Sequence, residues 1–267
     1  MLSKRFDQLK KTFRWNRDSS ILLSIFFLTI GLILYVWWPL AVEATKYLDW
    51  SGPWWRYMDW LLIGIFFFMS IAIVSRADLR LDTLTILVAT VGGLVIESWG
   101  TQTNLWHYYT AERPPLWIIP AWPIATLTIN RIVLVLDIFS ITRPSLHSGW
   151  KRAYWVIFPA FFVLMLTFIA PTFDKSYTIV ATLLVFLLII TPTDYRYAII
   201  TFVAGAGLGY FLEYWGTTRE CWTYYTFAKP PVFAVFAHGM AAVAFWRTEL
   251  LVKTLWQRTA LSIKKEE

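Results

Sequence analysis

One stretch of this chain occurs twice, in one register and without a gap: ESWGTQTNLWHYYTAERPP at residues 97–115 and EYWGTTRECWTYYTFAKPP at residues 213–231. Ten of the 19 aligned positions are identical, among them a glutamate, two tryptophans, two tyrosines and two prolines. Shared composition makes apolar helices resemble one another, but it does not align polar and aromatic residues in this way. The stretch therefore predicts an internal duplication with an offset of 116 residues.

The same offset continues on both sides of this stretch. It aligns further polar residues and a glycine, in the pairs Asp78 and Asp194, Arg80 and Arg196, Gly93 and Gly209, and Arg131 and Arg247. The duplicated unit thus covers roughly residues 59–131 and 175–247.

The composition is that of a membrane protein. Hydrophobic residues make up 58% of the chain and charged residues only 15%, and the mean hydropathy is +0.54. Because a membrane helix needs about 20 apolar residues, the sequence predicts eight spanning segments. They lie near residues 20–41, 59–75, 81–97, 116–136, 153–171, 176–192, 197–213 and 232–251.

We therefore expect an all-α, polytopic integral membrane protein with about eight transmembrane helices, arranged as two four-helix repeats. An even number of helices per repeat returns the chain to its starting side, so the two repeats are expected to be parallel. The predicted parts are a basic N-terminal segment at 1–18, membrane repeats at 19–142 and 143–252, and a tail at 253–267.

Basic residues set the expected orientation. Six of them precede the first apolar segment, which is long enough to remain as an anchor, so no cleavable signal peptide is expected. The positive-inside rule then places both termini in the cytoplasm, and we expect the protein in the bacterial inner membrane. On this topology only six of 24 Lys and Arg lie outside: Lys46, Arg56, Arg113, Lys175, Arg219 and Lys229. The net charge of +7 is thereby explained without a nucleic-acid partner.

Two carboxylates stand at equivalent positions near the outer helix ends, Glu97 and Glu213. A carboxylate at that depth must be paired, hydrated or protonated. If protonated, each is an acid that can donate a proton. The alternative is that each only hydrogen-bonds the following loop, or neutralises Arg113 or Lys229. At the cytoplasmic helix ends, Asp78, Arg80, Asp194 and Arg196 are expected to form helix caps and ion-pair clusters between the halves.

The loop after each glutamate is rich in aromatic residues with the same spacing in both copies. Tryptophan and tyrosine gather at membrane interfaces in any case, but the repeated register indicates a specified loop, either a shared scaffold or a surface that stacks on a long isoprenoid. The predicted substrate-binding residues are Trp99, Trp106, Tyr108, Tyr109, Trp215, Trp222, Tyr224 and Tyr225.

The second copy carries more titratable groups, because His238 replaces Trp122 of the first copy. His238 is a candidate to orient or deprotonate Glu213, or to act as a general base; the alternative is a hydrogen-bonding core histidine. No metal-ligand spacing joins Glu97, His107, Glu213 and His238, and the sequence has no phosphate-binding or dinucleotide-binding motif, so neither a metal nor a cofactor is predicted. The single cysteine, Cys221, excludes an internal disulfide.

The repeated motif resembles the membrane carotenoid-biosynthesis proteins of the carotenoid hydratase type. The resemblance rests on ESWGTQTNLWHYYT with PPLWIIPAWP, and on EYWGTTRECWTYYT with PP alone, about a quarter of the chain. This chain departs from the family at Asn104, Leu105 and Trp106, where the family is glycine-rich, and at Phe236, where the later proline is missing. The resemblance implies a cofactor-free enzyme acting on a C40-type polyene, with Glu97 and Glu213 as the acids.

Two classes of function remain open. The first is a membrane enzyme, a lyase (hydratase) or an isomerase, that hydrates, cyclises or isomerises an isoprenoid or carotenoid-like lipid with Glu97, Glu213 and His238 as catalytic residues. The second is a non-enzymatic protein, either a lipid-binding accessory subunit or a transporter of a membrane complex. The expected partners are membrane lipids and a hydrophobic isoprenoid, with an oligomer or a complex partner left open.

Overall fold

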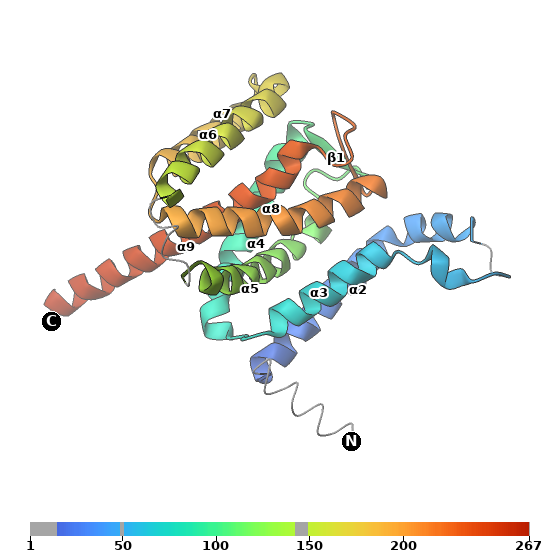
Figure 1. The fold of residues 1–267 in the computed structure, drawn as a ribbon, viewed down its shortest axis with the longest axis horizontal. Helices are drawn as coiled ribbons and strands as arrows, with labels where there is room; N and C mark the ends of the chain where they lie inside the picture. The colour runs from blue at the N-terminus through green and yellow to red at the C-terminus, as the bar shows by residue number, and fades with distance from the viewer. Residues whose placement is uncertain (1–14, 49–50, 142–148, 267) are drawn as a thin grey trace.

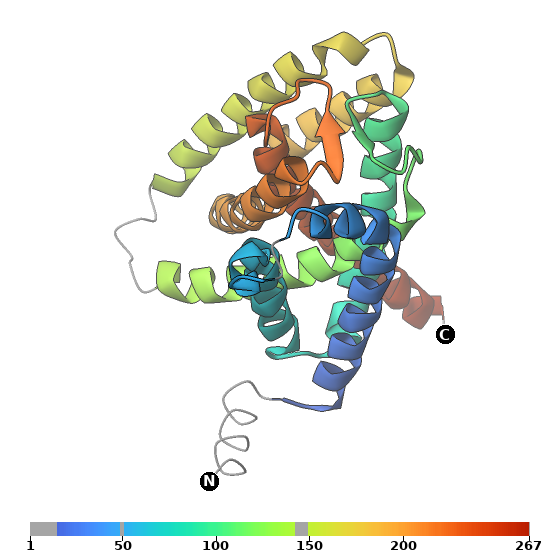
Figure 2. The ribbon, with the colours of Figure 1, turned by 90° about the vertical axis from the view of Figure 1, so that its right-hand side faces the viewer.

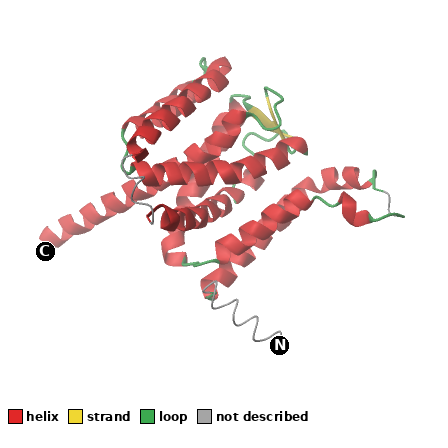
Figure 3. Cartoon of the chain, in the orientation of Figure 1, coloured by secondary structure: helices red, strands yellow, loops and turns green. Residues whose placement is uncertain are grey.

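The structure, a computed structural model, describes residues 15–48, 51–141 and 149–266 and is built from helices (Figure 1). The predicted basic segment lies largely at residues 1–14, outside this part of the chain. The long helices are α2 (Arg17–Thr45), α3 (Trp60–Val74), α4 (Leu79–Gln102), α5 (Ala121–Ile141), α6 (Gly149–Ile169), α7 (Ser176–Ile190), α8 (Tyr195–Thr218) and α9 (Val232–Glu266). Short elements are the 3-10 helices η1 (Trp54–Tyr57), η2 (Leu116–Ile118) and η4 (Ala170–Thr172), and the strands β1 (Trp106–Tyr108) and β2 (Trp222–Tyr224) (Figure 3).

Six helical segments of the described chain are long and apolar enough to cross a membrane. They are Arg17–Thr45, Leu79–Gln102, Leu116–Ile138, Gly149–Thr172, Tyr195–Thr218 and Val232–Thr259. A helix occupies each of the other two predicted segments as well, but α3 and α7 have only 15 residues each. At 1.5 Å per residue such a helix is about 22 Å long, shorter than the roughly 30 Å hydrocarbon core. Of the eight predicted segments, six thus contain a helix that is long and apolar enough to span a membrane.

Large apolar side chains cover the outside of these helices. Leu28 on α2, Phe67 on α3 and Val156 on α6 are each at least two-thirds exposed. Apolar surface on this scale is unusual for a protein surrounded by water. It is the surface that a lipid environment accommodates.

The elements recur at a constant spacing along the chain. Helices α3 and α7, helices α4 and α8, and strands β1 and β2 have identical lengths, and each second element begins 116 residues after the first. The strands pair with each other antiparallel, with Trp106 opposite Tyr224, His107 opposite Thr223 and Tyr108 opposite Trp222. The central pair, His107 and Thr223, joins positions that are themselves 116 residues apart. The two strands are therefore related by a local two-fold axis that passes through this pair.

Helices α4, α5, α8 and α9 form the centre of the molecule, and the α2–α3 and α6–α7 hairpins lie on opposite sides of it (Figures 1 and 2). Helices α8 and α9 make the closest approach, which depends on glycines. A Cβ atom at Gly205 would lie 2.8 Å from the carbonyl oxygen of His238, and one at Gly239 would lie 2.5 Å from that of Phe202. Any larger side chain would therefore push the two helices apart.

Charged residues fix the helix ends at the side opposite to the strands. The Asp78 carboxylate accepts from the backbone N–H groups of Arg80 and Leu81 and caps α4, and Asp194 accepts from that of Tyr197 and caps α8. The expected caps are thus present.

Two ion pairs connect helices at the same side. Arg196 on α8 binds Asp137 on α5 at 2.6 Å, and Arg131 on α5 binds Asp82 on α4 at 2.6 Å. Within residues 15–48, 51–141 and 149–266, Arg80 forms no ion pair. Of the predicted cluster of Asp78, Arg80, Asp194 and Arg196, only Arg196 forms one of these ion pairs, and its partner Asp137 lies outside the predicted set.

The Asp82–Arg131 pair allows a test of the packing. Its two side chains are only 7% and 12% exposed. Asp82→Ala should lower the stability of the purified protein in detergent by about 3–5 kcal/mol, because it leaves the Arg131 charge buried and unpaired. Thermal unfolding followed by circular dichroism measures this loss.

Two further variants complete that test. The double variant Asp82→Ala with Arg131→Met should recover most of the stability, because it removes both charges. Asp174→Ala, which disrupts the exposed pair with Lys175, is the control and should cause no measurable change. Equal melting temperatures for the wild type and Asp82→Ala would contradict a structural role for the buried pair.

Candidate functional site

The first copy of the motif surrounds Glu97 with hydrogen-bond donors. Glu97 lies near the C-terminal end of α4, and only 4% of its surface is exposed. Its carboxylate accepts from the Trp106 indole N–H at 3.0 Å, from the Tyr108 hydroxyl at 3.0 Å and from the Trp122 indole N–H at 3.1 Å. Three hydrogen bonds from neutral donors offset much of the free energy that burying this carboxylate costs.

The second copy repeats this arrangement around Glu213, on α8, with one exchange. Glu213 is 4% exposed and accepts from the Trp222 indole N–H at 2.9 Å and from the Tyr224 hydroxyl at 2.9 Å. The third position is held by His238, whose Nε2 lies 2.9 Å from Glu213 Oε1. Each partner of Glu213 stands 116 residues after its counterpart at Glu97.

Local sequence explains why the loop folds back onto its glutamate. A Cβ atom at Gly100 would lie 1.9 Å from the Trp106 ring, and one at Gly216 would lie 2.0 Å from the Trp222 ring. Because these glycines have no side chain, each indole can pack directly against the helix that precedes it, Trp106 against α4 and Trp222 against α8. The chain reverses through Asn104 and Glu220, which have φ values of 60° and 56°.

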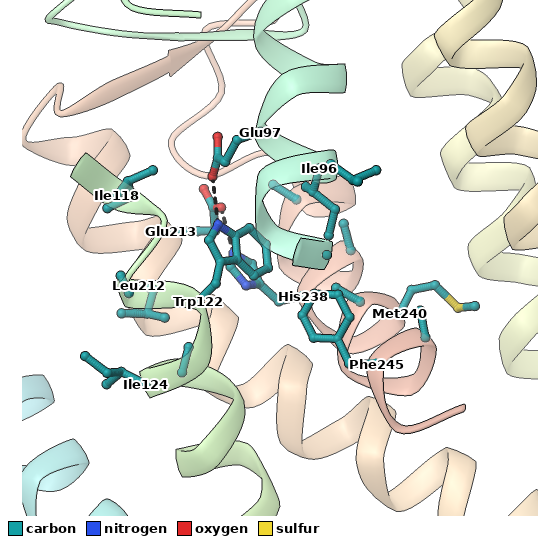
Figure 4. Close-up of a pocket in the computed structure, with 18 of the residues that line it drawn as sticks. Ile96, Glu97, Ile118, Trp122, Ile124, Leu212, Glu213, His238, Met240 and Phe245 are labelled. Carbon is teal, nitrogen blue, oxygen red and sulfur yellow. Dashed lines mark hydrogen bonds and ion pairs between the residues drawn. The ribbon is translucent and has the colours of Figure 1, made fainter. Parts of the chain in front are cut away.

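The third partner of each carboxylate comes from a different helix. Trp122 lies on α5 and His238 on α9, and their rings lie over Gly93 and Gly209, where an added Cβ would approach to 2.3 Å and 2.5 Å. The two rings stack on each other, with centroids 5.7 Å apart and an interplanar angle of 17°. Figure 4 shows the two carboxylates converging on this stacked pair.

The loop that contains β1 and the loop that contains β2 also pack against each other. The Trp106 ring packs against Tyr224 and the Tyr108 ring against Trp222, each with centroids 5.8 Å apart. At the strand ends, the Tyr109 N–H donates to the Cys221 carbonyl and the Tyr225 N–H to the Leu105 carbonyl. Donors of one carboxylate therefore support donors of the other, and the two sites form one unit.

The remaining predicted aromatic residues divide into two groups. Trp99 and Trp215 face the cavity described below, and their indole N–H groups donate to Thr178 and Asp59. Tyr109 and Tyr225 do not line that cavity; their hydroxyls donate to backbone carbonyls of α2 and α6. These two tyrosines therefore hold the flanking hairpins, and their predicted role in binding a substrate does not follow from their position.

A cavity of about 770 Å³ opens directly beside the carboxylates. Glu97, Glu213 and His238 contribute to its wall, together with Trp106, Tyr108, Trp122, Trp222 and Tyr224, and most of the other lining residues are aliphatic or aromatic. A volume of this order is typical of ligand-binding sites. The site thus places two acidic groups and a histidine at the wall of an otherwise apolar space.

Two tyrosines and the cysteine of the loops remain protonated near neutral pH. Burial raises the pKa of Tyr108 and of Tyr224 well above that of a free tyrosine, and the neighbouring carboxylates add to this effect. Both hydroxyls therefore stay hydrogen-bond donors. Burial also raises the pKa of Cys221 to about 12, so its thiol is a poor nucleophile.

Other sequence-based candidates lie apart from this site. His107 is exposed at the centre of β1, and Lys229 pairs with Glu220 at 2.7 Å instead of with Glu213. In the part of the chain that the structure describes, no group of three or more His, Cys, Asp or Glu residues could hold a metal ion. Both glutamates bind their following loops, as the alternative expectation proposed, and Glu213 also contacts His238.

Trp122 is a partner of Glu97 that the sequence analysis does not assign to the site. The offset of 116 residues, which aligns it with His238, is the signal in the sequence that points to it. Its hydrogen bond to Glu97 depends on how closely α5 packs against α4, which the sequence does not show.

Comparisons with protein families, with curated proteins and with solved structures found no match.

Gly216 provides a test of this construction. Gly216→Ala should displace the Trp222 ring, break its bond to Glu213 and destabilise the protein by at least about 1–3 kcal/mol, the usual cost of overpacking. Gly207→Ala on the same helix is the matched control, since its Cβ would meet nothing within 4 Å. Thermal unfolding and tryptophan fluorescence would measure both variants. A Gly216→Ala protein as stable as Gly207→Ala would refute the proposed contact.

Proposed function

We propose that this protein is a membrane-embedded enzyme that acts on a hydrophobic isoprenoid or carotenoid-like lipid by acid/base chemistry. The observation that carries the proposal is the pair of buried, hydrogen-bonded carboxylates at the wall of an apolar cavity. Protonation of a carbon–carbon double bond needs an acid and neighbouring groups that stabilise a cation. The two carboxylates and the aromatic side chains of the cavity wall support both requirements.

The two carboxylates have different roles in this proposal. Trp122 can only donate a hydrogen bond, so Glu97 is held as an acceptor among three fixed donors. His238 can both take up and release a proton, so Glu213 and His238 together hold one proton that is transferable. We assign the proton donor to the Glu213–His238 pair and a secondary, electrostatic role to Glu97.

The proposed reaction begins with transfer of this proton to one carbon of a double bond. The π electrons form the new C–H bond, and the neighbouring carbon becomes cationic. The faces of Trp122 and Trp222 and the Glu97 carboxylate then stabilise the positive charge. Loss of a proton from a carbon next to the cation, back to the Glu213–His238 pair, completes an isomerisation. In a cyclisation, the π electrons of a second double bond first form a carbon–carbon bond to the cation, and the new cation then loses the proton. In a hydration, water adds to the cation and then loses a proton to the pair.

We also propose that the chain consists of two parallel four-helix repeats with both termini in the cytoplasm of a bacterial cell, in its inner membrane. The identical lengths of α4 and α8, the symmetric strand register and the matched carboxylate partners support the duplication. The orientation is supported by the distribution of basic residues.

A non-enzymatic lipid-binding subunit is the second candidate. It is favoured by the complete hydrogen bonding of each carboxylate, since three donors per carboxylate would also suit a purely structural lock. On this alternative the cavity holds a lipid that is released unchanged. The two candidates differ in whether the bound molecule is altered and whether that depends on Glu213.

The first experiment identifies the lipids and pigments that co-purify with the protein from its native membrane, by mass spectrometry. With Glu213→Gln the modified form of the bound lipid should fall by roughly 100- to 10,000-fold, the usual contribution of a general acid, while binding persists because Gln keeps the shape. Glu97→Gln should reduce it less. Wild-type amounts of product with Glu213→Gln would exclude the proposed acid, and bulk phospholipid alone in all three samples would favour the non-enzymatic subunit.

A second variant tests whether His238 takes part in the reaction while keeping the fold, because it introduces the residue that stands at the equivalent position of the first copy. His238→Trp restores the first copy's arrangement, because Gly209 leaves the same space for a ring that Gly93 leaves for Trp122. The protein should remain folded, with an indole N–H donating to Glu213, but product should be lost. Thermal unfolding and product analysis are measured on the same preparation. Full activity of His238→Trp would mean that the histidine takes no part in proton transfer.

A further inference from the structure

The cavity beside the carboxylates extends in two directions. The first arm lies between the α2–α3 hairpin and helices α5 and α8, with Ile33, Met69 and Leu212 in its wall. The second arm lies between the α6–α7 hairpin and helices α4 and α9, with Val185 and Ile96 in its wall. In Figure 4, Leu212 and Ile124 lie on one side of the carboxylates and Ile96, Met240 and Phe245 on the other.

The two arms share several equivalent residues. Positions 116 residues apart line both, for example Ile96 with Leu212 and Ile124 with Met240. Glu97, Glu213, Trp122 and His238 lie where the arms meet. One continuous space therefore crosses the local two-fold axis, with its ionisable groups at the centre.

The walls of both arms lack positive charge. Among the described residues that line the cavity there is no lysine and no arginine, and the only acidic groups are the two central glutamates. A phosphate or another anionic headgroup in either arm would be buried without a counter-charge, at high cost. An uncharged occupant therefore fits both arms.

We infer that the cavity binds one linear, uncharged hydrocarbon chain that runs through both arms. Its middle lies against Glu97 and Glu213, and one of its ends lies in each arm. This inference rests on the proposed function of the same site and specifies the form of its substrate. Two separate chains would bring two chain ends together at the junction and leave a gap beside the carboxylates, whereas one continuous chain fills the space without a void. The reacting double bond is then an internal one.

The side chains that line the two arms differ in size at two pairs of equivalent positions. Beside α7 the second arm has Ala181 and Val185 where the first arm, beside α3, has Ile65 and Met69. Smaller side chains leave more room for the ligand. The second arm therefore accepts the bulkier end of the chain.

Binding of squalene, a long linear hydrocarbon, to the purified full-length protein in lipid nanodiscs tests the inference. Native mass spectrometry should find one squalene per protein at saturation, and two molecules of farnesene, which is half as long. This stoichiometry is measured on the unmodified chain and does not depend on a variant folding. Two squalene molecules per protein, or none, would overturn the threaded arrangement.

The exchange of side chains between arms gives the matched variants. Ala181→Ile with Val185→Met gives the second arm the side chains of the first and should weaken squalene binding by at least tenfold. Ile65→Ala with Met69→Val widens the first arm and should not weaken it. Unchanged squalene affinity in the narrowed variant would show that the chain does not enter the second arm.

The outcome can be separated from that of the proposed function. One squalene bound to both the wild type and Glu213→Gln, without conversion of any lipid by the wild type, would keep the threaded binding site and reject the enzyme. Conversion of a native lipid together with a squalene stoichiometry of two would keep the enzyme and reject the threaded chain.

Discussion

The burial of two carboxylates inside a membrane-type helical fold is the constraint on which the rest of this structure depends. Glu97 and Glu213 are almost inaccessible, and each needs donors that the surrounding apolar side chains cannot supply. The loops after α4 and α8 meet this need with one indole N–H and one hydroxyl each. The position of the loops, and of the glycines that admit their rings, follows from this requirement.

The same constraint connects the halves. Because Trp106 packs on Tyr224 and Tyr108 on Trp222, the donors of each carboxylate are held in place by those of the other. The β1–β2 pair adds backbone hydrogen bonds at the same point. The flanking hairpins are attached to this centre through Trp99, Trp215 and the two outer tyrosines, so the cavity between hairpins and centre takes its shape from the loops as well.

Much of this arrangement could be predicted from the sequence, because it is encoded in local patterns. Apolar length predicted a helix at each of the eight segments, and the repeated motif pointed to Glu97, Glu213 and their aromatic neighbours. The shortness of α3 and α7 is visible in the sequence too, because their apolar runs are bounded by Asp59 and Ser75 and by Lys175 and Thr191. The sequence could not show that the hydroxyls of Tyr109 and Tyr225 bind α2 and α6, or that Arg196 pairs with Asp137 while Arg80 has no ion pair among the described residues, since these contacts depend on how distant helices pack.

The stacked pair of Trp122 and His238 has a consequence for how such a site can diversify. In a symmetric dimer of identical chains, any change at this position would occur twice, so the centre would hold two indoles or two imidazoles. A single chain is free of this restriction, and here one position holds an indole, which can only donate a hydrogen bond, while the other holds an imidazole. The contact between these two rings is therefore chemically asymmetric, although the carboxylates beside them have otherwise matching partners.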